Sequence, residues 1–566
     1  MIRGVLQRIA NAALHHVVAF VGERQARRQI AGFMQAVENS GPAQWALLEE
    51  FLAAHAGSQF WKDHGLDRVR SWADYRLAVP VGGYERFAGY IEPMLEGQRS
   101  SLLGAGEKLV MFAKTSGTTG RAKYIPVTRR FVRGYRRGWN IFGLRVILEH
   151  PRSYMRHIVQ LSSPEDEEIT PSGVPAGAIS GLLATTQKWI IRKHYPAPLQ
   201  TRWVKDATSK YYVTMRMAMG KDPAFITTAN PSTILALART VRDHAETLIR
   251  DVADGGLSKQ FDIPGEVRRA CRWRLSAQPA LARRLEGLLS ERGELLPKDY
   301  WRLDFLCCWT GGTLGLYLRE FPHFFGDLPI RDIGLLASEA RMSLPLQDGT
   351  ASGLLDVQHN VFEFIPEAEY GSATAGCLLP HELEVGGRYF VVLTNPAGLF
   401  RYDMGDLVEV TGMQGPTPLI RFLSRGKHTS SLTGEKLTEH QAVTAFGEVS
   451  SALARGHTSF VMGPVWGDPP GYRLSVDGPL PAGCGEGQFA EAMDAALQRL
   501  NVEYAEKRAS GRLGRLTVRC LAAGTIERLD RALLVSRSGR GEQFKHQYLY
   551  TQPGDDDAAL ARAEAG

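Results

Sequence analysis

The sequence predicts an α/β protein: a large N-terminal α/β domain with a β-rich subregion, plus a smaller, mobile C-terminal α+β domain. Three observations carry this prediction. Between residues 80 and 330, long helical patterns alternate with short apolar runs such as KLVMFA and HIVQLSS, which is typical of an α/β body with buried strands. Between 353 and 424, apolar runs such as RYFVVLT are separated by Gly, Pro and Asn turns, which indicates strands and hairpins. After Arg425 the pattern resets to a compact αββαβ-like unit.

The single elements follow from local patterns. Residues 1 to about 60 have apolar residues at helical spacing, and the first of these helices is expected to pack on the body. In the C-terminal unit we expect a helix over 438–456, strands over 458–465 and 471–478, one long amphipathic helix over 487–511, and a strand over 515–522. The acidic tail 554–566 is rich in small residues and is expected to be disordered. Because 566 residues exceed one ordinary core, we place two domains, at 1–424 and 425–566.

Composition excludes several classes of protein. The chain is 44% hydrophobic and 22% charged with a net charge of +7, but its basic residues are interleaved with acidic ones, so no nucleic-acid partner is expected. Six cysteines show neither C-x-x-C spacing nor a paired histidine, which argues against a zinc site or a disulfide framework and favours a reducing, cytoplasmic location. The sequence contains no uninterrupted run of about 18 apolar residues, so no membrane span is expected. The N-terminal stretch lacks a signal-peptide cleavage site, and a membrane-surface helix is the weaker alternative there.

A dense set of donors stands in the stretch KTSGTTGRAK, residues 114–123. It is not a Walker A loop, because the lysine follows the second glycine by three positions instead of one. The glycines allow backbone N–H groups to form an anion-binding nest, to which hydroxyl groups and a lysine would add donors. The alternative, a plain surface hairpin, rarely carries so many donors. The residues predicted to bind phosphate are Thr115, Ser116, Gly117, Thr118, Thr119, Gly120 and Lys123.

This loop resembles the signature of the adenylate-forming superfamily, which includes acyl-CoA synthetases and firefly luciferase. Matching segments follow in order along the chain: ASE at 337–339, YDMGD at 402–406, a hinge-like segment from Arg425, and QFK ending at Lys545. The resemblance implies that Ser338 and Glu339 lie at the nucleotide, with Glu339 holding Mg²⁺, and that Tyr402 and Asp406 belong to the ribose-binding motif. Arg425 would add a contact at the hinge, and Lys545 would be the catalytic lysine of the C-terminal domain.

Each of these residues also has a simpler interpretation. Glu339 alone could be a carboxylate at a helix start, Asp406 could close a turn with Gly405, and Lys545 could be a surface lysine. Their order along the chain favours the functional interpretation.

Flanking segments narrow the resemblance to one branch. The stretches 79–97, 172–180, 308–317 and 360–366, together with AKYIPVT after the loop, resemble the Gretchen Hagen family of acyl acid amido synthetases, over about residues 79 to 550. The chain departs from plant members at Leu335, where they carry a tyrosine that packs on the nucleotide. It also departs in the loop letters TTGRAK, which are closer to the general superfamily form.

The resemblance implies an ATP- and Mg²⁺-dependent ligase. Such an enzyme converts a carboxylic acid into an acyl adenylate with release of pyrophosphate, and then transfers the acyl group to the amine of an amino acid. Its C-terminal domain would swing about the hinge near 425 between the two steps. An acyl-CoA or carrier-thiol synthetase with the same first step is the alternative, and a non-catalytic acyl or nucleotide binder is a third. Small acid and amino acid substrates are the expected partners, and a monomer is compatible with the sequence.

Overall fold

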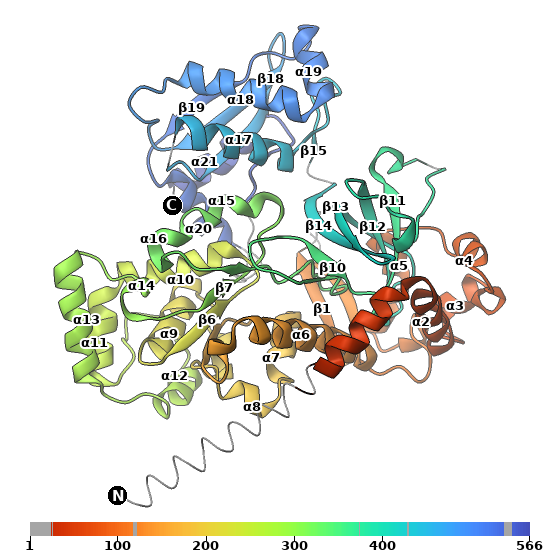
Figure 1. Cartoon of the computed structure of the whole chain (residues 1–566), viewed down its shortest axis with the longest axis horizontal. Helices are drawn as coiled ribbons and strands as arrows, with labels where there is room; N and C mark the ends of the chain where they lie inside the picture. The colour runs from red at the N-terminus through yellow and green to blue at the C-terminus, as the bar shows by residue number, and fades with distance from the viewer. Residues whose placement is uncertain are drawn as a thin grey trace, which may run out of the picture.

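The computed structural model describes residue 24 and residues 27–116, 122–372, 374–426, 429–454, 456–536 and 546–565. Figure 1 shows a broad body built from the first three quarters of the chain and a smaller lobe from the last quarter above it. The mixture of helices and strands confirms the predicted α/β class.

The N-terminal helices and the parallel sheet form much of the body. The first helices pack at one edge of it: α2 (Ser40–Ala54), α3 (Gln59–Asp63), α4 (Trp72–Ala78) and α5 (Tyr84–Leu95). A four-stranded parallel sheet has the order β3 (His157–Gln160), β6 (Pro223–Thr227), β7 (Phe305–Cys307) and β8 (Ile330–Arg331). Its apolar side chains share one core with α9 (Ala207–Met219), α10 (Pro231–Asp243), α11 (Ala245–Asp254) and α13 (Pro279–Arg292). The predicted alternation of helices and short buried strands in this region is therefore correct.

A second sheet carries the glycine-rich stretch. Its strands are ordered β2 (Ala122–Thr128), β1 (Leu109–Ser116), β5 (Pro175–Gly177) and β4 (Glu168–Ile169). β1 and β2 form an antiparallel pair, so residues 117–121 connect two strands of one hairpin. Thr128 caps the following helix α6 (Arg129–Glu149), because its hydroxyl accepts a hydrogen bond from the Phe131 N–H at 3.2 Å. The basic stretch RRFVRGYRR, residues 129–137, thus lies on a helix.

The β-rich subregion is a six-stranded antiparallel sheet. Its order is β11 (Val361–Pro366), β12 (Arg388–Thr394), β13 (Tyr402–Gln414), β14 (Thr417–Arg425), β10 (Gly353–Leu355) and β9 (Ser343–Pro345). The central strands are buried on both faces over much of their length, which explains their nearly continuous apolar sequence.

The C-terminal lobe has a core of its own around the strands β17 (Phe460–Val465), β18 (Gly471–Asp477) and β19 (Thr517–Leu521). α17 (Glu439–Leu453) and α18 (Glu486–Leu500) pack on this sheet, as the predicted αββαβ pattern requires. The single long helix predicted over 487–511 is wrong, because the chain breaks at Asn501 into α18 and α19 (Val502–Ala509). The Asn501 side chain accepts from the Tyr504 N–H at 2.9 Å and donates to the Glu435 carbonyl at 2.9 Å, so a tertiary contact fixes the break.

The expectation of a disordered tail is also wrong for the described residues. Residues Asp555–Ala565 form helix α21, which packs against α20 (Thr525–Ser536) and β17. Asp556 is fully buried and accepts a hydrogen bond from Arg473 on β18 at 2.8 Å. Gly463 on β17 leaves room for this carboxylate, since a Cβ at Gly463 would lie 2.4 Å from its Cγ. The acidic residues of the tail therefore dock on a basic strand.

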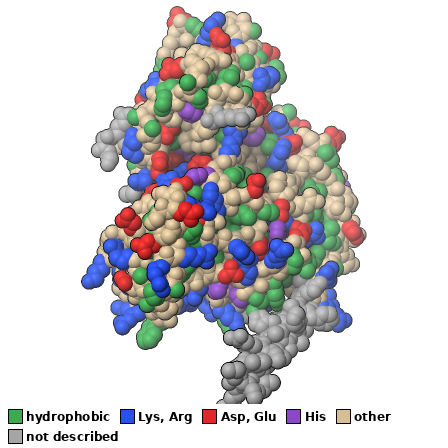
Figure 2. Space-filling model, turned by 60° about the vertical axis from the view of Figure 1, so that its left-hand side comes forward, with side chains coloured by type: hydrophobic (Ala, Val, Ile, Leu, Met, Phe, Trp, Pro, Cys, Tyr) green, Lys and Arg blue, Asp and Glu red, His purple; other side chains and the backbone are tan. Residues whose placement is uncertain are grey.

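The two lobes meet at α15 (Gly315–Leu318). Arg319 donates to the Ser450 hydroxyl at 3.0 Å and to the Gly447 carbonyl at 2.9 Å, both on α17. A cavity of about 670 Å³ opens at this junction, and none of the residues predicted for the site lines it. Figure 2 shows basic and acidic side chains interspersed over the visible face. None of the helices in the described part of the chain combines the length and the apolar character needed to cross a membrane.

Candidate functional site

The β1–β2 hairpin presents the described part of the glycine-rich stretch. Thr115 on β1 pairs with Lys123 on β2, so the predicted phosphate-binding lysine stands on the second strand. The Lys123 ammonium lies 5.2 Å from the centre of the Tyr84 ring, and the Tyr84 hydroxyl accepts from the Tyr124 N–H at 3.0 Å. α5 therefore contacts the hairpin near the start of β2. Gly117, Thr118, Thr119 and Gly120 lie outside the described residues, and only the backbone of Ser116 is described.

The segment that carries Ser338 and Glu339 is a tight, buried loop before β9. An isolated bridge pairs Leu336 with Arg341, and the Ala337 N–H donates to the Ala340 carbonyl at 2.7 Å. Ser338 and Glu339 are both less than a tenth exposed. Glu339 is therefore not a carboxylate at a helix start; it stands at the tip of a small hairpin-like turn. Leu335, which replaces the tyrosine of plant relatives, bonds through its N–H to the Ser343 hydroxyl at 2.9 Å.

The Y-x-x-G-D motif begins strand β13. Gly405 has a φ of +63°, a backbone conformation that side chains other than glycine rarely adopt, which explains the glycine at this position. Asp406 pairs with Arg425 across the sheet, and Arg425 Nε lies 3.1 Å from Asp406 Oδ1. The strand presents a buried carboxylate beside a half-exposed guanidinium at the end of β14. A simple turn, the alternative interpretation of Asp406, is thus excluded by the register of β13 and β14.

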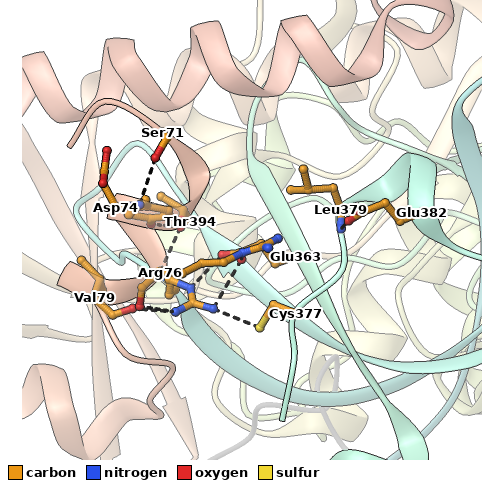
Figure 3. Close-up of polar contacts among 11 residues, drawn as sticks. Ser71, Asp74, Arg76, Val79, Glu363, Cys377, Leu379, Glu382 and Thr394 are labelled. Atoms are coloured by element: carbon orange, nitrogen blue, oxygen red, sulfur yellow. Dashed lines mark hydrogen bonds and ion pairs between the residues drawn. The ribbon is translucent and has the colours of Figure 1, made fainter. Parts of the chain in front are cut away.

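Arg401, the residue directly before this motif, has an unusual backbone conformation. Its φ is +50°, which is rare for a residue with a side chain. Its guanidinium donates to Glu363, to Cys377 and to the backbone carbonyls of Arg76 and Val79, all of which Figure 3 labels. Arg401 donates to Glu363 Oε2 at 2.8 Å and to the Val79 carbonyl at 2.7 Å, and its backbone N–H donates to the Thr394 hydroxyl at 2.9 Å. These bonds fix the direction in which Tyr402 leaves the preceding connection.

The predicted residues act on one another electrostatically. Burial raises the pKa of Glu339, and the charge of Asp406 adds to this effect, whereas Arg425 and Lys123 oppose it. Asp406 raises the pKa of Arg425, with Glu339 and Tyr402 contributing and burial acting in the opposite sense. Burial also raises the pKa of Tyr402, and Glu339 strengthens this shift. Five residues from four separate segments therefore lie near enough to influence one another's charge: Lys123, Glu339, Tyr402, Asp406 and Arg425.

A divalent cation would find one suitable carboxylate in this site. Within the described residues, Glu339 forms no ion pair; its side chain is almost fully buried, and its carboxylate accepts a hydrogen bond from its own backbone N–H. The same part of the chain contains no cluster of three or more His, Cys, Asp or Glu side chains that could hold a metal alone. This arrangement fits Mg²⁺, which proteins commonly bind through one or two carboxylates together with substrate phosphates.

The structure adds positions that the motifs did not reveal. Asn395 and Arg401 lie in the connection between β12 and β13, where Asn395 bonds to the Glu339 backbone and Arg401 directly precedes Tyr402. Tyr84 on α5 contacts Lys123. Of these three residues, only Arg401 stands next to a motif, directly before Tyr402. Lys545, the predicted catalytic lysine, lies outside the described residues, which resume at His546.

Comparison with known proteins identifies the family of the chain. Models of the GH3 family match residues 29–330 as its N-terminal domain, 353–425 as its central domain and 439–554 as its C-terminal domain. An indole-3-acetic acid-amido synthetase, GH3.8, of Oryza sativa subsp. indica is 26% identical over 564 residues, covering 91% of this chain and 89% of the relative. A jasmonoyl–L-amino acid synthetase, GH3.5, of Oryza sativa subsp. japonica is 26% identical over 544 residues, covering 88% and 90%.

The fold has a solved counterpart as well. The structure of the AtGH3.15 acyl acid amido synthetase in complex with 2,4-DB superposes with a TM-score of 0.82 at 19% sequence identity, covering 96% of each chain. Family models that together match most of the chain, in the same order as its three regions, place it within one family. This chain belongs to the GH3 family, the Gretchen Hagen family of its sequence resemblance.

Proposed function

We propose that the protein is an ATP-dependent ligase that joins a carboxylic acid to the amine of an amino acid. One observation carries this proposal: Lys123, Glu339, Asp406 and Arg425 come from separate segments and lie near enough to influence the charge of Glu339. The relatives named above are amido synthetases, which supports the same reaction class. Mg²⁺ and ATP are the cofactor and cosubstrate that the site would take.

Amide formation from a free acid requires activation, because a carboxylate is a poor electrophile. A carboxylate oxygen of the acid attacks the α-phosphorus of ATP, the bond from that phosphorus to the bridging oxygen breaks, and pyrophosphate leaves. Thr115, Ser116 and Lys123, with the glycines of the loop, would bind the leaving phosphates. Their N–H, hydroxyl and ammonium groups offer donors to the negative charge that the phosphates carry.

The other residues would hold the nucleotide and its cation. Glu339 would bind Mg²⁺, which when bound would shield the charge of the phosphates. Asp406, whose carboxylate lies beside the Arg425 guanidinium, would accept hydrogen bonds from the ribose hydroxyl groups. Ser338 and Tyr402 would line the nucleotide beside these groups.

In the second step the amine nitrogen attacks the acyl carbon, AMP leaves, and the nitrogen loses a proton. Lys545 would stabilise the carboxylate and the α-phosphate during the first step, brought to the site by the smaller domain. We assign residues 1–424 to the domain that binds ATP and acid, and 425–566 to the domain that carries this lysine. A thiol acceptor such as coenzyme A would use the same first step, so the acceptor must be tested directly.

Pyrophosphate release measures the first step. The full-length protein is incubated with ATP, Mg²⁺ and a panel of aryl and alkyl acids, and the acceptor is varied between amino acids, coenzyme A and none. We expect acid-dependent pyrophosphate release, and an amide product only when an amino acid is present. A thioester product with coenzyme A and no amide would overturn the assignment of the acceptor. Absence of acid-dependent release from every acid, while the protein is folded, would contradict the enzyme assignment.

The role of Lys545 has its own test. We expect Lys545→Ala to lower the rate of adenylate formation severely while the dissociation constant of ATP changes little, because the lysine acts on the reacting groups. Lys436→Ala is the matched control, since Lys436 is a lysine of the same domain whose side chain is 71% exposed. Equal rates for the two variants would remove Lys545 from the mechanism.

A further inference from the structure

The connection between β12 and β13 contains a fully buried asparagine, Asn395. Its side-chain oxygen accepts from the N–H groups of Ala397 at 2.9 Å and Leu399 at 3.2 Å, which closes the turn Asn395–Leu399. Its side-chain nitrogen points out of that turn and donates to the backbone carbonyl of Glu339 at 2.8 Å. One amide group therefore joins the turn before β13 to the loop of the predicted metal ligand.

The same turn contacts two other segments of the site. The Pro396 carbonyl accepts from the Thr128 hydroxyl at 3.3 Å, and Thr128 ends strand β2, on which Lys123 stands. At the other end, Thr394 accepts from the Arg401 N–H immediately before Tyr402. The connection thus touches the phosphate hairpin, the Glu339 loop and the start of the Asp406 strand, and all of these contacts are buried or nearly so.

We infer that Asn395 is a positioning residue that sets the place of Glu339 relative to the nucleotide, through the hydrogen bond from its side-chain nitrogen to the Glu339 carbonyl. This inference rests on the proposed function, in which Glu339 holds Mg²⁺. Asn395 touches neither substrate nor cation; it acts through the backbone of the residue that does.

The oxygen and the nitrogen of the Asn395 amide bond to different parts of the protein, so a substitution that changes only one of them can distinguish a positioning role from a purely structural one. The oxygen stabilises the turn, and the nitrogen alone reaches the site. Asn395→Asp keeps an acceptor of the same shape for Ala397 and Leu399 but removes the donor to Glu339. The added negative charge would by itself attract a cation, so direct electrostatic repulsion of the cation does not explain a loss of cation binding in this variant.

Asn501 offers a matched control. It is buried in the C-terminal lobe, and its oxygen accepts from the Tyr504 N–H at 2.9 Å. Its nitrogen donates to the backbone carbonyl of Glu435 at 2.9 Å and to Gln441 Oε1 at 3.1 Å. Asn501→Asp therefore makes the same chemical change at the same kind of hydrogen bond, away from the site. Both variants are expected to lower the melting temperature, because each loses a buried donor.

The experiment is equilibrium binding of a non-hydrolysable α,β-methylene ATP analogue to the full-length protein, by calorimetry, with Mg²⁺ and with a chelator. The quantity of interest is the ratio of the two dissociation constants. We expect Asn395→Asp to reduce the gain from Mg²⁺ about tenfold, while binding without Mg²⁺ changes less than about twofold. Asn501→Asp should leave the ratio as in the wild type. In a Glu339→Gln background, Asn395→Asp should have no further effect on the ratio, because both act through one ligand.

The outcomes separate the two proposals. A wild-type protein that does not bind the nucleotide overturns the proposed function and this role together. A wild-type protein whose binding depends on Mg²⁺, beside an Asn395→Asp variant with the same ratio, overturns the role of Asn395 alone. An equal additional loss in the Glu339→Gln background also contradicts it, since the effect would then not pass through Glu339. If Asn395→Asp fails to fold, Asn395→Ser is measured in the same way, and an unchanged ratio in that variant refutes the role.

Discussion

Arg401 combines a buried ion pair with a strained backbone, and these two features respond differently to substitution. Its side chain is about 6% exposed and faces Glu363, whose side chain is 2% exposed. Its φ of +50° is unfavourable for any residue with a Cβ. Arg401→Ala removes the guanidinium and keeps the strain, whereas Arg401→Gly removes both.

The expected magnitudes follow from these contacts. Removing one partner of a buried ion pair typically costs about 3–5 kcal/mol. Glu363 retains a second partner, Arg76, whose Nε lies 2.8 Å away, so we expect the lower end, about 3 kcal/mol for Arg401→Ala. A left-handed backbone costs a non-glycine residue about 1–2 kcal/mol, and the greater unfolded-state freedom of glycine offsets about 0.5–1 kcal/mol of the relief. Arg401→Gly should therefore be more stable than Arg401→Ala by about 0.5–1 kcal/mol.

Urea unfolding with a probe of the large domain measures this order. Because a chain of this size need not unfold in two states, the midpoints of the first transition are compared and the slopes are checked for equality. A glycine variant that unfolds at lower urea than the alanine variant would refute the argument from backbone strain. An alanine variant within about 0.5 kcal/mol of the wild type would refute the argument from the buried ion pair.

Two further predictions concern stability. Gly138→Ala in α6 should destabilise the protein, because the new Cβ would lie 2.7 Å from Arg341 Cδ. Gly143→Ala in the same helix meets nothing within 4 Å and should stabilise the protein by up to about 1 kcal/mol. Thermal melts of both variants test these two expectations. His546 Nδ1 faces Asp530 Oδ1 at 2.6 Å and its Nε2 faces the Phe460 carbonyl at 2.9 Å, so both nitrogens donate and the ring is charged. Burial opposes this charge, but Asp530, the Phe460 carbonyl and Glu439 outweigh it and raise the pKa of His546. The stabilisation is complete below the unfolded-state pKa of about 6.5 and is lost as pH rises through the folded-state pKa, so the melting temperatures of wild type and His546→Gln should converge on raising the pH. A constant difference across that range would contradict a charged ring.

The sequence was sufficient for the elements whose patterns are local. Strand β1 follows from one apolar run, and the strands of the six-stranded sheet follow from apolar runs separated by turn residues. Strand β2, which pairs with β1, was not predicted. Where a distant contact decided the outcome, the local pattern failed. The sequence over 487–511 has continuous amphipathic periodicity, yet Asn501 breaks the helix and bonds to Glu435. The polar tail forms a helix that is held to the lobe by the contact of Asp556 with Arg473 and by its packing on α20 and β17.

The same distinction between local patterns and distant contacts applies to the residues of the candidate site. Residues that would touch the nucleotide stand in short motifs, because their chemistry demands particular side chains at fixed spacing, and Glu339, Tyr402 and Asp406 were predictable for that reason. Residues that place those motifs relative to one another obey no such spacing. Asn395 lies 56 positions from Glu339, and Arg401 lies 38 positions from Glu363, so nothing local marks either pair. The segment TNPAGLFR between β12 and β13 has the composition of an ordinary turn. The fold alone shows that it bonds to Thr128 at the end of β2 and to the Glu339 loop and leads directly into Tyr402. Tests of positioning in this protein therefore belong in that turn, and tests of binding belong in the motifs.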